Sequence, residues 1–174
     1  MDFETSYLYC SKKLIDPLQE VQEIYSVVKA VSWVPGKITA LKGNGKEVAW
    51  QEAYNRLFEI EFEKIDGWEL HPLLSKKPRH KGDVLKNDVF VEIQFGHTAT
   101  IYRDYYKFHY GFMNRLLTLA VLIVPTNPLK FFPERNPASF RNMASYKYAL
   151  EHFSALSIPV PILIIGLLPR NIED

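Results

Sequence analysis

Residues 82–96 read GDVLKNDVFVEIQFG, and this stretch decides the fold expected for the chain. Val84-Leu85-Lys86 and Val89-Phe90-Val91 flank Asn87-Asp88, a pair typical of a tight turn. A turn there places Asp83 directly opposite Glu92 on one face of a hairpin. Opposed Cβ atoms lie roughly 4.5–5.5 Å apart, and like charges at that separation are destabilising. We therefore expect a cation between the two carboxylates.

Gln94 lies two residues beyond Glu92, so its side chain should leave the same face of the strand. Two carboxylates and a polar neighbour on rigid strands suit a hard, oxygen-preferring cation such as Mg²⁺. The alternative is a surface hairpin, in which Asp83 is a solvated turn residue and Glu92 is an edge-strand charge that discourages aggregation.

Length and composition indicate one globular domain over residues 1–174. The chain is 47% hydrophobic and 24% charged, as is ordinary for soluble proteins. A single Cys10 excludes an internal disulfide, and the acidic start of the chain is unlike a signal peptide, so a cytoplasmic location is expected. The net charge of +1 argues against an indiscriminate nucleic-acid binder. Residues 76–107 nevertheless carry seven Lys or Arg against four Asp or Glu, which is compatible with an enzyme acting on a polyanion.

The rest of the chain predicts helices and strands in alternation. Asp16 as cap and Pro17 at the first helical position predict the start of one helix. Residues 46–65 predict a second, although residues 58–63 alternate like a half-buried strand; Gly67, a natural terminator, favours the helix. Further elements are expected as a strand at 68–74, a helix at 101–116, a buried strand at 117–124, a helix from Ser139 to about residue 156, and a buried strand at 160–167. This order indicates an α/β fold with a central mixed sheet flanked by helices.

The segment from Gly82-Asp83 to Glu92-Ile93-Gln94-Phe95-Gly96 resembles the active-site hairpin of PD-(D/E)xK nucleases. It is most similar to the branch that contains the BglII and BstYI restriction endonucleases, which has Glu-x-Gln where most relatives have Lys in the third place. The specific match covers residues 67–110, and elsewhere only the order of elements agrees. Gly82 stands where the name-giving Pro would be.

The resemblance implies a restriction-endonuclease-like core in which Asp83, Glu92 and the backbone carbonyl of Ile93 ligate Mg²⁺. It also implies that Gln94 orients the attacking water. Gln94 cannot act as a base, because an amide does not titrate usefully. The missing Lys puts in doubt any mechanism that needs a cationic side chain at position 94.

The function implied by the resemblance is that of a Mg²⁺-dependent type II restriction endonuclease. Such an enzyme hydrolyses double-stranded DNA at a short palindromic site, and the analogy with the BglII branch suggests a GATC-centred target. One hairpin cuts one strand, so a homodimer is expected to cut both. The alternatives are a structure-specific or DNA-repair nuclease of the same fold, and a catalytically silent DNA-binding module.

Two basic segments are candidates for DNA contacts. The run before Asp83 should position phosphates, unless it is only a solvated loop. The loop at 133–142 offers donors and acceptors for bases, unless its Asn and Ser residues are helix caps. His97 should face DNA or make a structural hydrogen bond. The candidate residues are Lys77, Arg79, Lys81, His97, Arg135, Asn136, Ser139 and Arg141. An acid from the second helix could approach the metal, the choice lying among Glu52, Glu59, Glu61 and Glu63.

Overall fold

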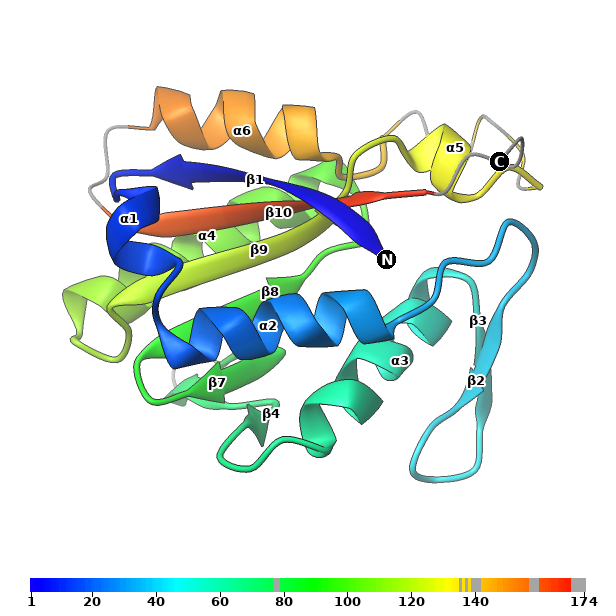
Figure 1. Cartoon of the computed structure of the whole chain (residues 1–174), viewed down its shortest axis with the longest axis horizontal. Helices are drawn as coiled ribbons and strands as arrows, with labels where there is room; N and C mark the ends of the chain where they lie inside the picture. The colour runs from blue at the N-terminus through cyan, green and yellow to red at the C-terminus, as the bar shows by residue number, and fades with distance from the viewer. Residues whose placement is uncertain (77–78, 135, 137, 139–141, 157–159, 170–174) are drawn as a thin grey trace.

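A computed structural model describes residues 1–76, 79–134, 136, 138, 142–156 and 160–169. Its centre is a six-stranded mixed sheet with the strand order β1-β10-β9-β8-β7-β4. Strands β8, β9 and β10 run parallel, whereas β1, β7 and β4 each pair antiparallel with their neighbours (Figure 1). The strands are β1 (Asp2–Leu8), β4 (Glu69–Leu70), β7 (Val84–Lys86), β8 (Val89–Ile93), β9 (Leu119–Pro125) and β10 (Ile162–Leu168). The predicted α/β class with a central mixed sheet is confirmed.

Both faces of the sheet are covered by helices, because successive strand residues point to opposite sides. On β9, Val121 and Ile123 join a core with α2 (Gln19–Ala30) and α3 (Gln51–Glu63). Leu122 and Val124 join a second core with α4 (Thr98–Met113) and α6 (Tyr146–Ala155). Figure 1 shows α2 in front of the sheet and α4 behind it.

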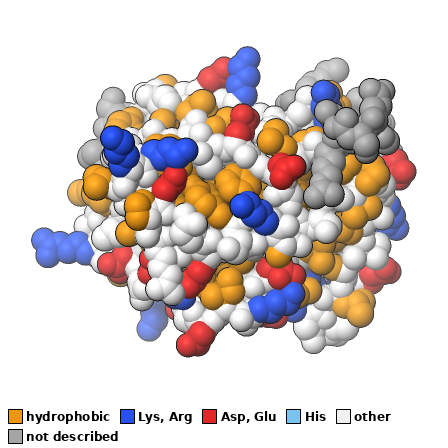
Figure 2. Space-filling model, in the orientation of Figure 1, with side chains coloured by type: hydrophobic (Ala, Val, Ile, Leu, Met, Phe, Trp, Pro, Cys, Tyr) orange, Lys and Arg blue, Asp and Glu red, His pale blue; other side chains and the backbone are white. Residues whose placement is uncertain are grey.

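Smaller elements lie at the periphery of this frame. The short helices are α1 (Lys12–Ile15) and α5 (Pro128–Phe131), and the two-stranded ladders are β2 (Thr39–Leu41) with β3 (Glu47–Ala49) and β5 (Leu73–Lys76) with β6 (Arg79–Lys81). Apart from the start of β5, none of these elements was predicted, nor was β1. On the face that carries α2, acidic, basic and apolar side chains are interspersed (Figure 2). Among the described residues, no helix combines the length and the apolar character needed to cross a membrane.

The first two helices begin later than predicted. Asp16 does not cap α2; it accepts hydrogen bonds from the hydroxyls of Tyr7 and Tyr25, and Leu18 takes the cap position without a side-chain bond. Residues 47–49 pair as β3 rather than opening α3. The helix at 51–63 is nevertheless confirmed over the alternating-strand alternative. Phe58 and Phe62, four residues apart, are both fully buried on one helical face.

Other boundaries shift for local reasons. The predicted strand at 68–74 is interrupted, because His71 has a φ of 55° and separates β4 from β5. Helix α4 begins at Thr98, where the His97 ring accepts a hydrogen bond from Ala99 N. Helix α6 begins only at Tyr146, after Ser145 as its cap; the predicted cap Ser139 lies outside the described residues.

Candidate active site

The carboxylate hairpin has the predicted register. Val84 pairs with Val91, and Leu85 pairs with Phe90, around a turn at residues 87–88. Leu85 and Phe90 pack in the core beneath α4. Two residues further from the turn on each strand, the same face carries Asp83 and Glu92. Both acids therefore lie on one face of the hairpin, as the sequence predicted, and the structure shows that α4 packs over this face.

Gly82 precedes the hairpin because the ring of Phe90 leaves no room for a side chain. A Cβ built on Gly82 would lie 2.1 Å from Phe90 Cε2. Real Cβ atoms do not approach carbon that closely. The replacement of the family's Pro by Gly thus has a steric cause in this chain.

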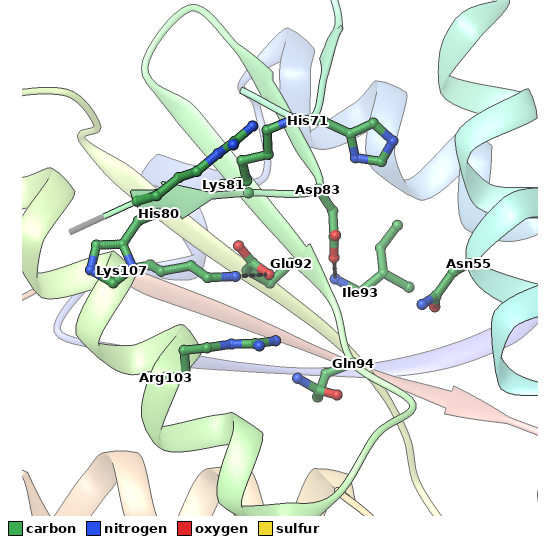
Figure 3. Close-up of a pocket in the computed structure, with 12 residues that line it drawn as sticks. Asn55, His71, His80, Lys81, Asp83, Glu92, Ile93, Gln94, Arg103 and Lys107 are labelled. Atoms are coloured by element: carbon green, nitrogen blue, oxygen red, sulfur yellow. Dashed lines mark hydrogen bonds and ion pairs between the residues drawn. The ribbon is translucent and has the colours of Figure 1, made fainter. Parts of the chain in front are cut away.

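The hairpin forms the floor of a pocket of about 450 Å³. Figure 3 shows side chains converging on it from β6, β8, α3 and α4, and from Asp83 just before β7. The lining of the pocket includes Asp83, Glu92, Gln94, Asn55, Arg103 and Lys107. A concave site lined by convergent titratable groups is the expected form of an active site.

Asp83 is held in place by the backbone of β8. Its Oδ2 accepts a hydrogen bond from Ile93 N over 2.7 Å. Burial raises the pKa of the Asp83 carboxyl above its ordinary value, an effect that the Ile93 N–H and the Lys107 charge partly oppose.

Glu92 is buried and only half satisfied. It is 3% exposed, and its Oε2 accepts a hydrogen bond from Lys107 Nζ over 2.7 Å. Its Oε1 accepts none within the described residues. Burial, followed by the charges of Asp83 and Asp104, raises the pKa of the Glu92 carboxyl well above 4.5. A buried carboxylate with an open oxygen is an available ligand for a cation.

Gln94 lies on the Glu92 side of the strand, and its amide is fixed at both ends. Nε2 donates to Asp104 Oδ2, and Oε1 accepts from Gly96 N over 2.7 Å. A Cβ at residue 96 would lie 2.7 Å from that amide oxygen, so the glycine leaves room for the Gln94 side chain to bend back to the backbone of residue 96. Gln94 is therefore oriented for positioning rather than left to rotate.

Helix α4 supplies two charged residues that the sequence reading missed. Asp104 is fully buried and Lys107 is 5% exposed. Asp104 Oδ1 lies 3.3 Å from Lys107 Nζ, which completes a chain Gln94–Asp104–Lys107–Glu92. A signal was present: Asp104 falls between Ile101 and Phe108 in the apolar stripe of α4, where a charge is unexpected.

Helix α3 contributes an amide, not an acid. Asn55 lines the pocket, and its buried Oδ1 has no hydrogen-bond partner among the described residues. None of the four glutamates considered lines this pocket; each has a basic partner on or beside α3. The pairs are Glu52 with Lys42, Glu59 with Arg56 and His71, Glu61 with Lys64, and Glu63 with Arg56. A mid-helix Asn within a run of glutamates gave no sequence signal.

The predicted DNA contacts divide into three groups. Arg79 and Lys81 line the pocket, together with Arg103 from α4, which was not predicted. His97 is exposed and caps α4, outside the pocket lining. Asn136 is exposed, and its Oδ1 accepts from Ala138 N over 2.9 Å. The remaining candidates, Lys77, Arg135, Ser139 and Arg141, lie outside the described residues.

The residues present fit a hard divalent cation held by few protein ligands. No group of three or more His, Cys, Asp and Glu side chains in the described part of the chain is arranged as a metal site. Asp83 and Glu92 offer two carboxylates, one with an unused oxygen, and Ile93 lies between them and Gln94 on the pocket wall. Mg²⁺ retains several waters and is commonly bound by one or two carboxylates plus substrate phosphate, so this sparse set suits it.

Comparisons with known proteins agree with the family that the hairpin resembles. The family model for restriction endonuclease BglII/BglIII matches residues 4–167. The crystal structure of BglII complexed with a DNA 16-mer superimposes with a TM-score of 0.75 at 16% identity, covering 98% of this chain and 79% of that one. Free BglII gives a TM-score of 0.63 at 17% identity, covering 98% and 81%. A search of curated proteins finds no significant match. The chain belongs to the BglII/BglIII restriction endonuclease family.

Proposed function

We propose that this type II site-specific deoxyribonuclease uses Mg²⁺ to hydrolyse phosphodiester bonds of double-stranded DNA at a short palindromic site. The observation that carries the proposal is the pair Asp83 and Glu92. Both acids project from one face of the hairpin into an open pocket, and Glu92 keeps an oxygen unused. Two neighbouring acids, of which Glu92 is buried and Asp83 half-buried, are costly to ionise side by side, so a divalent cation between them would offset their repulsion.

In this proposal Asp83, Glu92 and the backbone carbonyl of Ile93 hold the ion. When bound, Mg²⁺ would neutralise charge on the attacked phosphate and make water a better nucleophile. Gln94 cannot take a proton from that water, but its fixed amide can orient it. Each of these groups lies on the sheet or is tied to it, which gives the precision that in-line attack requires.

Double-stranded DNA is supported as substrate by the pocket rim. Arg79, Lys81 and Arg103 surround the acidic floor with positive charge. Such side chains position phosphates without reading sequence. The related BglII structure contains a DNA 16-mer, which is consistent with DNA as the substrate.

A homodimer follows from the symmetry of the proposed substrate. One hairpin carries one set of acids and attacks one strand. Two copies related by a two-fold axis would attack both strands of a palindrome. A GATC-centred target is proposed by analogy with the BglII branch.

The test is digestion of plasmid DNA by the purified protein in Mg²⁺. Discrete fragments support restriction, and the mapped ends would show whether the sites contain GATC. A smear, or cutting only of branched DNA, would point instead to a repair nuclease of the same fold. The matched control is Asp88→Asn, which removes an exposed carboxylate from the turn of the same hairpin and should leave the fragments unchanged. Intact plasmid in both Mg²⁺ and Mn²⁺ would contradict the proposal.

A further inference from the structure

Position 94 carries no positive charge, yet the pocket contains a buried cation from another element. Lys107 extends from α4 across the pocket to Glu92, as Figure 3 shows. Its side chain is only 6% exposed, but it lines the same pocket as the two proposed metal ligands. A lysine is seldom buried unless it is paired, and burial at a pocket wall calls for an explanation.

The position of Lys107 is set by two carboxylates. Nζ lies 2.7 Å from Glu92 Oε2 and 3.3 Å from Asp104 Oδ1. Asp104 is fully buried, and it is held in turn by the amide of Gln94. Release of Glu92 to another cation would therefore leave the ammonium anchored by Asp104 at the same edge of the pocket.

A second ion pair, which joins β7 to α2, shows how a structural pair is built. Lys86 Nζ lies 2.8 Å and 3.0 Å from the two oxygens of Glu23, which also accept bonds from Trp68 and Gln19. Both oxygens of Glu23 are used. In the Lys107–Glu92 pair one carboxylate oxygen has no partner among the described residues. An ion pair formed only for stability would be expected to satisfy its buried oxygens.

The formal charge of the pocket also indicates that Lys107 has a role beyond stability. Asp83, Glu92 and Asp104 with Lys107 leave a formal charge of −2, from three carboxylates and one ammonium. One divalent cation cancels that charge. A phosphate then brings one more negative charge to a pocket whose nearest buried positive side chain is Lys107.

We propose that Lys107 is a catalytic residue, whose ammonium donates to a non-bridging oxygen of the scissile phosphate and supplies from α4 the cation that the hairpin lacks. This inference rests on the proposed function. In the metal-free protein the ammonium donates to Glu92 Oε2; with Mg²⁺ and DNA bound, Glu92 would be a ligand of the metal and Lys107 would be free to donate to the phosphate. Charge developing on the phosphate oxygens is then stabilised by a group already in position.

The test compares Lys107→Met with Lys86→Met, which removes the structural pair described above. Cleavage is measured under single-turnover conditions at saturating Mg²⁺, on a duplex that carries a site cut by the wild type. We expect Lys107→Met to cleave about 100-fold more slowly, as for loss of a transition-state donor. Lys86→Met should lose thermal stability but cleave at the wild-type rate.

Two further measurements separate catalysis from a merely structural role. Calorimetry without DNA should show Mg²⁺ binding to Lys107→Met at least as tightly as to the wild type, because a competing cation has gone. Fluorescence anisotropy in Ca²⁺ should show DNA affinity within about threefold of wild type, since the lost contact strengthens mainly in the transition state. If Lys107→Met does not melt cooperatively, Lys107→Gln, which retains a donor to Glu92, takes its place with the same expected loss.

Cleavage by either folded variant within about threefold of the wild-type rate at saturating Mg²⁺ would overturn the assignment. So would weakened Mg²⁺ binding that fully accounts for a slow rate. Failure of the wild-type protein to cut any DNA is a different result, because it contradicts the proposed function itself.

Discussion

Lys107 Nζ donates to Glu92 Oε2 over 2.7 Å, and this contact joins the helix behind the sheet to the hairpin that carries the acids. Both residues are almost completely buried. Glu92 thus has one oxygen satisfied by the protein and one left open toward the pocket. The arrangement keeps a second carboxyl group beside Asp83 without saturating it, which is what a site for an exchangeable cation requires.

Replacing Glu92 should abolish cleavage without abolishing the fold. Glu92→Gln keeps the shape and removes the charge that holds the ion, and loss of several kcal/mol of charge stabilisation corresponds to a rate reduced by more than about 10³-fold. Single-turnover cleavage at saturating Mg²⁺ measures it. Asp88→Asn is the control, and cleavage by Glu92→Gln near the wild-type rate would refute the assignment of the metal ligand.

The metal-free protein should become less stable as pH rises, because burial raises the pKa of the Glu92 carboxyl well above its ordinary 4.5. The folded state then holds more protons than the unfolded chain. The contribution of Glu92 to the free energy of unfolding is therefore intact below pH 4.5 and is lost as pH rises through the folded pKa.

The comparison is between the wild type and Glu92→Gln in thermal melts with EDTA. The two should melt at similar temperatures at about pH 5, and the wild type should melt lower at about pH 8, because the Glu92 carboxyl ionises more readily in the unfolded chain than in the folded one. Added Mg²⁺ should raise the wild-type Tm more at the higher pH, because the ion binds the carboxylate form. A wild type that melts above Glu92→Gln at the higher pH in EDTA would contradict this reading.

Asn55 should act in catalysis rather than in stability. Its Oδ1 lies in the pocket wall with no described hydrogen-bond partner, so Asn55→Ala loses no bond of the metal-free protein. We expect about a tenfold slower cleavage from poorer positioning of water or phosphate, with Tm nearly unchanged. Glu52→Gln, an exposed change on the same helix, should cleave normally. A large drop in Tm for Asn55→Ala with unchanged cleavage would assign it a structural role.

Gly82 should be required for packing of the hairpin. Gly82→Ala places a Cβ against the ring of buried Phe90, and overpacking of this kind costs about 1–3 kcal/mol of unfolding free energy. Urea unfolding measures the loss. Gly43→Ala, where a Cβ meets nothing within 4 Å, is the matched control and should leave stability almost unchanged. Equal stability of the two variants would show that the ring of Phe90 moves aside freely.

The hairpin part of the site could be predicted from the sequence because its geometry depends only on neighbouring residues. A turn at residues 87–88 and the two-residue period of a strand suffice to bring Asp83 opposite Glu92 and to place Gln94 on the same side. The choice of helix for residues 51–63 also rests on short-range facts, namely the spacing of Phe58 and Phe62.

What the sequence determined by itself was the hairpin, its two acids and the family it resembles. The tertiary structure decided the remaining charges and the helix amide: Lys107 and Asp104 reach Glu92 and Gln94 only because α4 packs across the back of the sheet, and Asn55 arrives from the other side on α3. It also decided β1, which within the described residues pairs with β10 alone, more than 150 residues later in the chain. Contacts of that separation depend on how buried faces meet in space, and no periodicity within one segment encodes them.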